Sequence, residues 1–558
     1  MNKQTIITIL FALAAMAGNG QTKSSALLRG RIVNVPKESE NRLSMHYYDP
    51  LQTISSNDVP LQLDSFGHFD VEVPLLDTAP VELVWTRLLL SPGETYDVEM
   101  DGATGCVVVK GRDAALSNEV IQHQPEGCVW DMEAMKNETD AFVIDAAEKE
   151  LKRLEATNDS IQKAFGLSEQ WRDYARYRVM STMADYLVQR RYVDAVVRQS
   201  ADGKLWQWLH EYFICQMPRP FTLIQDHLGY IVMNYMMEVV SPRVRKGFNL
   251  RGIDTAISIA LEQQADGTIS RSEAFADSMR TLRTMLHEYK ALSDAGTPDS
   301  ILASHSFAKA VPQYFSDTYL NGLITGGAVG ERETVENINR VASLNMPDDI
   351  RDYARAVLLY NQIEQYHASL KPTLLKLASE VKNDFFRTRI IEESNRYHEL
   401  ALRSDYEASL MPNTPLSGLT VGEGIFSKII KPYRGRILFV DFWGTWCGPC
   451  KADLKNHARL LHQALNDLPV TYLYLCNGSA TEAWRSTIAE YSLTGEHIVH
   501  YNLPAAQQQA VEKYLGVHHF PTYIIFDRDG QRVTTEENEP KPYNPEAVRR
   551  MMLGLIDK

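Results

Sequence analysis

Two cysteines three residues apart carry the chemistry that stands out most in this sequence. Cys447 and Cys450 enclose a Gly-Pro dipeptide, follow an apolar run at 437–440 and precede a segment with apolar residues at helical spacing. A helix that starts at Cys447 turns free backbone N–H groups and the positive end of its dipole toward the sulfur, which favours the nucleophilic thiolate. Cys450 lies about one turn further on, close enough to attack a mixed disulfide. The spacing therefore predicts thiol–disulfide exchange through a redox disulfide between Cys447 and Cys450.

A zinc site and an inert structural disulfide are the two alternatives for this pair. Zinc normally takes four ligands, often from a second C-x-x-C or a nearby pair of histidines. The only other cysteine in this region is Cys476, and the whole chain has six cysteines, too few for a scaffold built on disulfides. We therefore predict redox use of the pair, with no metal ligands and no cofactor.

Asp441 is the second candidate catalytic residue, because it ends the apolar strand six residues before Cys447. A buried carboxylate is costly, and burial raises its pKa. A carboxyl with a raised pKa can accept and return a proton as Cys450 becomes a thiolate. The alternative is an acid at a strand end that faces solvent, and we favour the catalytic role.

Pro521 is the third candidate, at the head of another apolar strand in Phe520-Pro521-Thr522. Proline removes one donor from a strand ladder, and an X–Pro bond has only a weak preference for trans. A cis Pro521 packed against the thiols would leave nearby backbone free to pair with a substrate strand. The alternative, an ordinary trans proline at a strand start, is statistically commoner for an isolated X–Pro bond.

The remaining sequence predicts several domains, because 558 residues exceed a single hydrophobic core. Short strands with period-two alternation predict a β-rich domain at 26–112, a small β-sandwich. Apolar residues at helical spacing then predict a mostly α-helical region at 113–408, including one helix over Leu374 to Phe385 with Pro372 just ahead as its start signal. Strands and helices alternate at 411–558, which predicts an α/β layer fold.

Within 411–558 the predicted elements follow one another closely. Strands are expected at 437–440, 470–475 and 522–526, and a turn at 527–530 leads to a return strand at 531–535. The expected helices are those at about 482–491, about 505–515 and from Pro545 onward.

The N-terminus has the pattern of a signal peptide at residues 1–20. Lys3 precedes an apolar run from Thr5 to Ala17 that is too short to span a bilayer, and Ala15-Met16-Ala17 matches a cleavage signal. A retained signal anchor is the alternative. We expect export to the periplasm or another extracytoplasmic location. The net charge of −14 argues against a nucleic-acid partner.

Residues 436–450 and 516–530 resemble the thioredoxin superfamily, and the last quarter of the chain is similar to the extracytoplasmic TlpA/ResA-like disulfide reductases. The resemblance implies a thioredoxin-like fold for this quarter. The resemblance also implies the roles of five residues. Cys447 is the nucleophile, Cys450 the resolving thiol, Asp441 the buried acid, Pro521 the cis-proline and Trp446 a flanking contact residue. We assign Phe520, next to Pro521, to substrate binding together with Trp446.

Two positions depart from the TlpA-like pattern. That family usually has a glutamate two residues before a proline after the second cysteine, whereas Asp453 here is followed by Leu454 and Lys455. Asp441 is more similar to cytoplasmic-type thioredoxins, because TlpA-like proteins often have asparagine there.

Together these features predict an exported thiol–disulfide oxidoreductase that reduces protein disulfides and takes electrons from a membrane thiol donor. A disulfide oxidase or isomerase is one alternative, and an exported protein that binds a partner or ligand and carries an accessory redox domain is another. A peroxiredoxin is excluded, because Gly444 and Val440 stand where that family has threonine and proline.

Overall fold

The computed structural model describes residues 25–35, 43–47, 49–53, 57–135, 138–193, 204–216, 228–239, 250–314, 318–325, 327–533 and 541–556. The predicted signal peptide lies outside these residues. Within the described ranges, no helix combines the length and the apolar character needed to cross a membrane. The chain forms two compact units, residues 1–239 with 345–357 and residues 240–344 with 358–558. The domain boundaries expected near 112 and 408 stay a prediction.

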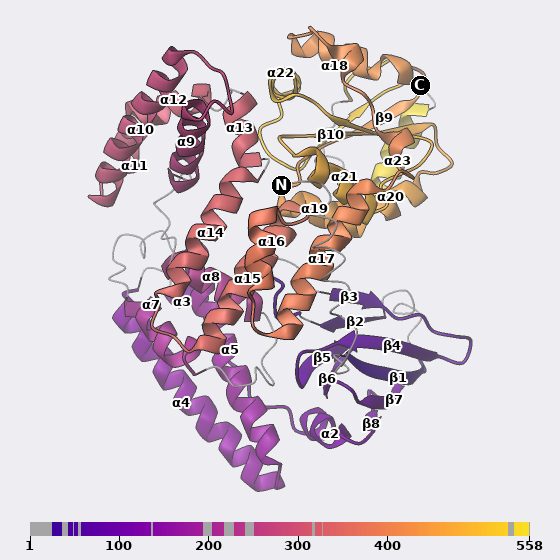
Figure 1. The fold of residues 1–558 in the computed structure, drawn as a ribbon. Helices are drawn as coiled ribbons and strands as arrows, with labels where there is room; N and C mark the ends of the chain where they lie inside the picture. Colours follow the sequence, from indigo (N-terminus) through magenta and orange to yellow (C-terminus); the bar gives the residue numbers. More distant parts are fainter. Residues whose placement is uncertain are drawn as a thin grey trace. The chain divides into compact units, whose positions relative to one another are not determined.

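The first unit begins with two four-stranded sheets (Figure 1). One sheet has the order β4 (His68–Pro74), β1 (Ser25–Val33), β7 (Thr95–Asp101), β8 (Val107–Lys110), and the other has the order β3 (Asn57–Pro60), β2 (Ser44–Tyr47), β5 (Ala79–Leu83), β6 (Thr86–Leu90). Alternate residues of β7, such as Tyr96 and Val98, are buried, as period-two patterning requires. Side chains from both sheets share one core, which confirms the predicted β-rich N-terminal part.

A single helix, α2 (Ala114–Gln122), covers one strand edge of each sheet. The Ser117 hydroxyl donates to the Leu89 carbonyl at 2.7 Å and accepts the Leu89 N–H at 2.8 Å, on β6. The Asn118 amide accepts the Val109 N–H at 3.1 Å and donates to the Val109 carbonyl at 2.8 Å, on β8. These side chains take the place of neighbouring strands and block further pairing at both edges.

Helices make up the central region, as predicted. In the first unit they are α3 (Met132–Met135), α4 (Asp140–Phe165), α5 (Glu169–Val193), α7 (Lys204–Leu209), the π-helix η1 (His210–Ile214) and α8 (Leu228–Val239). Those that follow are α9 (Leu250–Ala265), α10 (Glu273–Asp294), α11 (Asp299–Leu302), α12 (Ser306–Tyr314), α13 (Thr318–Thr325), α14 (Ala328–Ala342), α15 (Asp348–Tyr366), α16 (Pro372–Ser379) and α17 (Asp384–Leu402).

The single helix predicted over Leu374 to Phe385 is wrong, because the chain forms two helices there, α16 and α17. The side chain of Asn383 accepts the Phe386 N–H at 3.1 Å and so caps the start of α17. Asparagine favours this N-cap position over a helix interior, which explains the break.

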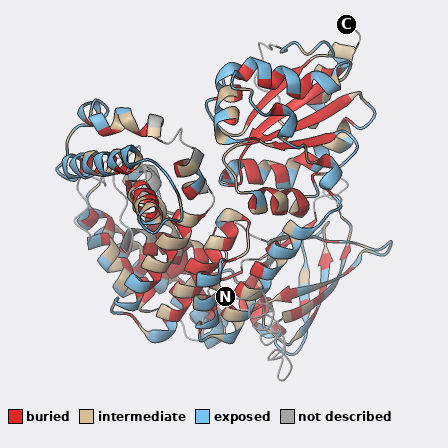
Figure 2. Ribbon diagram, turned by 45° about the horizontal axis from the view of Figure 1, so that its top comes forward, coloured by how far each residue is buried: buried red, intermediate tan, exposed pale blue. Residues whose placement is uncertain are grey.

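The C-terminal part is an α/β structure around a sheet of order β11-β10-β9-β12 (Figure 1). Its strands are β9 (Ile437–Trp443), β10 (Val470–Cys476), β11 (Ile498–Asn502) and β12 (Thr522–Phe526). The first three are parallel, and β12 runs antiparallel to β9. Every residue of β9, β10 and β12 is buried, and Figure 2 shows these strands buried along their length. The predicted α/β fold is therefore confirmed.

Helices cover both faces of this sheet, which explains why β9, β10 and β12 are buried along their whole length. The helical elements are η2 (Glu407–Ser409), η3 (Thr414–Leu416), α18 (Gly422–Ile430), η4 (Lys431–Tyr433), α19 (Gly448–Asp453), the π-helix η5 (Leu454–Ala458), α20 (Arg459–Ala464), α21 (Thr481–Glu490), α22 (Ala505–Leu515) and α23 (Pro545–Ile556). One core contains side chains of η5, α20, α21 and α23, and the other contains side chains of α18 and α22.

Two predictions for this sheet differ from the structure. Strand β11 was not predicted. Of the predicted return strand at 531–535, the described residues 531–533 form only a bridge between Phe526 and Arg532, and 534–535 lie outside the described residues. Val533 adds one backbone hydrogen bond, from its N–H to the Ile525 carbonyl at 2.9 Å.

Candidate active site

The cysteine pair lies where β9 passes into α19. Cys447 is the N-cap residue of α19, and Pro449 lies in its first turn. Thr445 lies two residues before Cys447. Its N–H and its hydroxyl each donate a hydrogen bond to the Ser479 hydroxyl at 3.0 Å. The strand end and the helix start thus fix the position of both thiols.

Cys447 and Cys450 form a disulfide. The Cys450 N–H points at the Cys447 sulfur at 3.1 Å, the contact of a helix N-cap. A thiolate at this position would accept the same N–H and lie at the positive end of α19. Cys447 is 5% exposed and Cys450 is 1% exposed, so Cys447 is the more exposed residue of the pair.

Asp441 lies on the face of β9 that α19 covers. It is 4% exposed, between Tyr474 on β10 and Tyr523 on β12 in the strand registers. Burial raises the pKa of this carboxyl well above its usual range, and the nearby charge of Asp453 acts in the same direction. Its Oδ1 atom makes no hydrogen bond with the described residues. The carboxyl is therefore enclosed in the core and does not face solvent.

Asp453 and Tyr523 are site residues that the sequence analysis did not select. The Tyr523 hydroxyl donates to Asp453 Oδ2 at 2.7 Å, and Asp453 lies three residues after Cys450, on the same helix. A signal for Tyr523 was present, since it stands two residues after Pro521 and so faces the same side of β12.

Trp446, next to Cys447 in the chain, contacts Phe520, and Pro521 follows at the start of β12, whose Thr522 pairs with Phe442 of β9. The Phe520–Pro521 peptide bond is cis. The rings of Trp446 and Phe520 meet edge to face, with centroids 5.3 Å apart, and Trp446 is 45% exposed. Trp446 Nε1 also donates to the Asn477 carbonyl at 3.1 Å. The six residues assigned from the sequence thus share one region of the domain, and their individual roles stay predictions.

The other four cysteines are not in disulfides: Cys106 is exposed, Cys215 is half-buried, and Cys128 and Cys476 are buried. Burial raises the pKa of Cys128 to about 11 and that of Cys476 to about 12. Such thiols carry little thiolate at neutral pH and are poor nucleophiles. Within the part of the chain that the structure describes, no three His, Cys, Asp or Glu residues are grouped to hold a metal ion.

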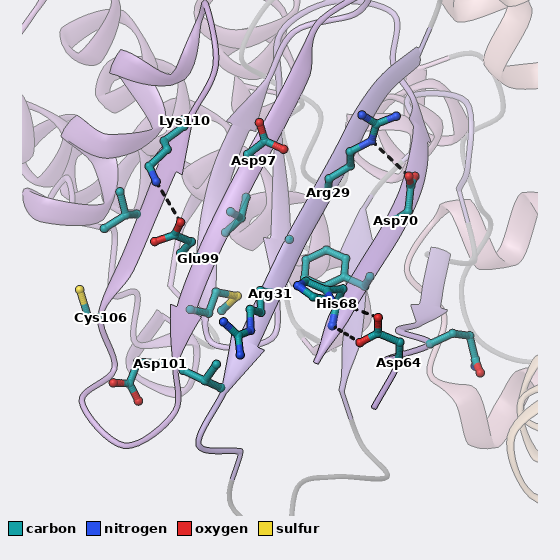
Figure 3. A pocket seen from close by; sticks show the side chains of 17 residues that line it. Arg29, Arg31, Asp64, His68, Asp70, Asp97, Glu99, Asp101, Cys106 and Lys110 are labelled. Carbon is teal, nitrogen blue, oxygen red and sulfur yellow. Dashed lines mark hydrogen bonds and ion pairs between the residues drawn. The ribbon is translucent and has the colours of Figure 1, made fainter. Parts of the chain in front are cut away.

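A hollow of about 1260 Å³ lies elsewhere, on the outer face of sheet β4-β1-β7-β8 in the first unit (Figure 3). Its side chains pair across strands: Arg29 Nε lies 3.2 Å from Asp70 Oδ2, and Lys110 Nζ lies 2.9 Å from Glu99 Oε1. All four side chains are more than half exposed. This pattern is that of a solvated sheet face with matched charges, and the hollow contains no residue of the disulfide site.

Comparison with known proteins identifies the region around the disulfide. A family model described as thioredoxin-like matches residues 435–532. The thiol-disulfide oxidoreductase ResA of Bacillus thuringiensis subsp. konkukian is 26% identical over 112 residues, 20% of this chain and 60% of ResA. A thioredoxin of Malassezia sympodialis is 22% identical over 100 residues, 18% of this chain and 67% of that protein.

Among solved structures, the thioredoxin domain of a thiol-disulfide oxidoreductase from Bacteroides vulgatus is similar, with 21% identity and a TM-score of 0.19. The match covers 22% of this chain and 84% of that domain. The chain spans only three fifths of the ResA relative, and the family model leaves residues 1–434 outside its match. Residues 435–532 thus form a thioredoxin-like domain that is distantly similar to the thiol-disulfide oxidoreductase ResA.

Proposed function

We propose that this protein is an exported thiol–disulfide oxidoreductase that reduces disulfides of other proteins through Cys447 and Cys450. The observation that carries the proposal is the position of Cys447, at the N-cap of α19, with its sulfur 3.1 Å from the Cys450 N–H. That geometry favours a thiolate on Cys447, the nucleophile of the exchange.

The reaction follows two displacements at sulfur. The Cys447 thiolate attacks one sulfur of a substrate disulfide, forms a mixed disulfide and releases the other substrate sulfur as a thiolate. Cys450 then loses its proton and attacks the Cys447 sulfur, which releases the second substrate sulfur and leaves the Cys447–Cys450 disulfide. Asp441, when ionised, accepts the Cys450 proton, since its raised pKa makes it a stronger base than an ordinary carboxylate. The released substrate thiolates are protonated by solvent.

Return to the reduced form needs two electrons from a donor. For an exported protein we propose a membrane thiol carrier, which would reduce Cys447–Cys450 by the reverse exchange. The export itself rests on the N-terminal sequence pattern at residues 1–20. Fractionation of cells that express the full chain, with a determination of the mature N-terminus, tests this part of the proposal.

The direction of the reaction rests on the Gly-Pro dipeptide between the cysteines, which thioredoxin shares, with a potential of about −270 mV. Equilibration of the full chain with glutathione measures the potential of this pair. A value near −270 mV supports a reductase. A value near −120 mV, that of DsbA, would support an oxidase instead.

Trapping identifies the substrate class. A Cys450→Ala variant keeps Cys447 but cannot resolve the mixed disulfide, so it should accumulate covalent complexes that dithiothreitol releases. The matched control is Cys476→Ala, which removes a buried cysteine from the same domain and should trap nothing. Equal trapping by both variants would argue against the assigned roles.

A further inference from the structure

The residue after the resolving cysteine has an unusual environment. Lys451 is only 7% exposed, and its N–H donates to the Cys447 carbonyl at 3.1 Å. Its ammonium donates to the carbonyls of Glu364 and Gln365, each at 3.2 Å. These two carbonyls belong to the last turn of α15, where backbone oxygens have no helical partner and carry partial negative charge. Lys451 therefore ties α19 to the end of α15.

A second group of contacts within the second unit joins the end of α15 and α17 to α21. His367 follows α15, and its Nδ1 lies 3.0 Å from Glu490 Oε2, at the end of α21. Arg396 and Tyr397 of α17 also reach Glu490, with Nη2 3.0 Å from Oε1 and the hydroxyl 3.0 Å from Oε2. Although burial opposes it, the hydrogen bonds and charges of His367 and Arg396 lower the pKa of Glu490 to about 2.

The charged groups that act on Lys451 come from both sides of this contact. Burial lowers the pKa of Lys451 to about 8, while Glu364 on α15 and Glu490 on α21 act in the opposite direction. Burial lowers the pKa of His367, and the charge of Lys451 acts in the same direction. At neutral pH Lys451 therefore carries its charge for most of the time, enclosed between a helix end and two carboxylates.

Lys451 is connected to the redox pair through the first turn of α19. Cys447 is the N-cap residue of this helix, and its carbonyl accepts the Lys451 N–H, four residues further on. A fixed positive charge about one helical turn from Cys447 favours its thiolate, which exists only when the disulfide is reduced. Holding Lys451 in place also holds the first turn of α19, whose Cys450 N–H points at the Cys447 sulfur.

We propose that residues 358–402 are a fixed part of the redox module, and that Lys451 is the positioning residue through which they favour the reduced form of Cys447 and Cys450. This inference rests on the proposed function, because it concerns the equilibrium of the same pair. It assigns a role to the end of α15, to α16 and to α17, which lie outside the thioredoxin-like match at 435–532.

The test is the equilibrium of the full chain with glutathione, in which the protein disulfide and two glutathione thiols give the protein dithiol and one glutathione disulfide. Lys451→Met keeps a side chain of similar length and removes the charge. Lys455→Met is the matched control, because Lys455 is an exposed lysine on the following turn. The state of the pair is read by alkylation and mass spectrometry of the peptide that contains both cysteines.

We expect Lys451→Met to shift the equilibrium constant toward the disulfide by about threefold to tenfold, since one unit in the pKa of Cys447 corresponds to about tenfold. Lys455→Met should leave the constant unchanged. Equal constants for all three proteins would overturn the inference and leave the proposed function standing. Failure of the wild-type pair to exchange with glutathione at all would overturn both.

A second measurement needs no variant and so does not depend on the folding of Lys451→Met. Coupling is reciprocal: if residues 358–402 favour reduction, then reduction must tighten their contact with the domain by the same factor. Amide hydrogen exchange of the wild-type protein should therefore slow in 358–402 on reduction and stay the same in α10, the control helix. Unchanged exchange in 358–402 would contradict the coupling.

Discussion

The hydroxyl of Tyr523 donates a hydrogen bond to Asp453 at 2.7 Å, and this bond holds a second carboxylate near the buried Asp441. Tyr523 also lies opposite Asp441 in the register of β12 and β9. One residue therefore connects the strand of the buried acid, through strand pairing, with the helix of the cysteines, through its hydroxyl. Burial and the charge of Asp453 both keep Asp441 protonated to higher pH than an ordinary carboxyl. Several measurable consequences depend on this arrangement.

The first concerns stability. The folded protein keeps the Asp441 proton at a pH where the unfolded chain, with an ordinary pKa of about 3.9, has released it. The stabilisation is therefore complete below about pH 4 and is lost as pH rises toward the raised pKa, by up to about 1.4 kcal/mol per pH unit. Asp441→Asn should remove this dependence. Urea unfolding of the oxidised wild type and the variant at several pH values checks it, and parallel curves would contradict it.

The second concerns the pH dependence of the reaction. Asp453→Asn removes the negative charge that helps to raise the pKa of Asp441, so the acid limb of the rate of disulfide reduction should move to lower pH. Tyr523→Phe frees Asp453 to turn to solvent and should shift the limb the same way by a smaller amount. Tyr514→Phe, at an exposed tyrosine of α22, is the control. An unmoved profile in Asp453→Asn would show that this carboxylate does not act on Asp441.

A third expectation concerns the exposed aromatic pair. Trp446→Ala removes a ring that meets Phe520 edge to face and is 45% exposed beside Cys447. Loss of one aromatic contact with substrate, worth about 1 kcal/mol, should raise KM about fivefold with little change in kcat. Trp85→Ala, at a 41% exposed tryptophan of the first unit, should leave KM unchanged. A larger effect of Trp85→Ala would favour a binding role for the N-terminal sheets.

The cysteines should differ sharply in reactivity toward iodoacetamide. In the oxidised folded protein Cys106 should react first, because it is exposed, whereas the pKa of about 12 leaves Cys476 almost without thiolate at pH 8. After reduction Cys447 should react well before the more deeply buried Cys450. Peptide mapping over time gives each rate. Equal rates for Cys447 and Cys450 would contradict the assignment of Cys447 as nucleophile.

The centre of the site could be predicted from sequence because its chemistry is local. Cys447, Cys450 and the start of α19 lie within one helical turn, and the apolar run before them predicts the buried strand that carries Asp441. A cis bond at Pro521 could be considered from the sequence because X–Pro bonds have only a weak preference for trans, and the resemblance to thioredoxins implied it.

What the sequence did not predict depends on distant contacts. A lysine is ordinarily solvated, and Lys451 is buried only because the end of α15, 86 and 87 residues earlier, supplies its acceptors. Strand β11 was missed because it carries a histidine, yet His500 is fully buried and its Nε2 lies 2.8 Å from the Leu493 carbonyl. In contrast, Asn383 was a local signal that should have marked the start of α17.

The most direct test of the account is the reduction of a protein disulfide by the full chain and by Cys447→Ser, with a chemical thiol as electron source. Cys476→Ser is the matched control, since it changes a cysteine of the same domain outside the redox pair. We predict that Cys447→Ser loses at least about a thousandfold in rate, because a hydroxyl cannot replace the thiolate, while Cys476→Ser keeps its activity wherever it remains folded. Activity retained in Cys447→Ser would contradict the central claim that Cys447 carries the reaction.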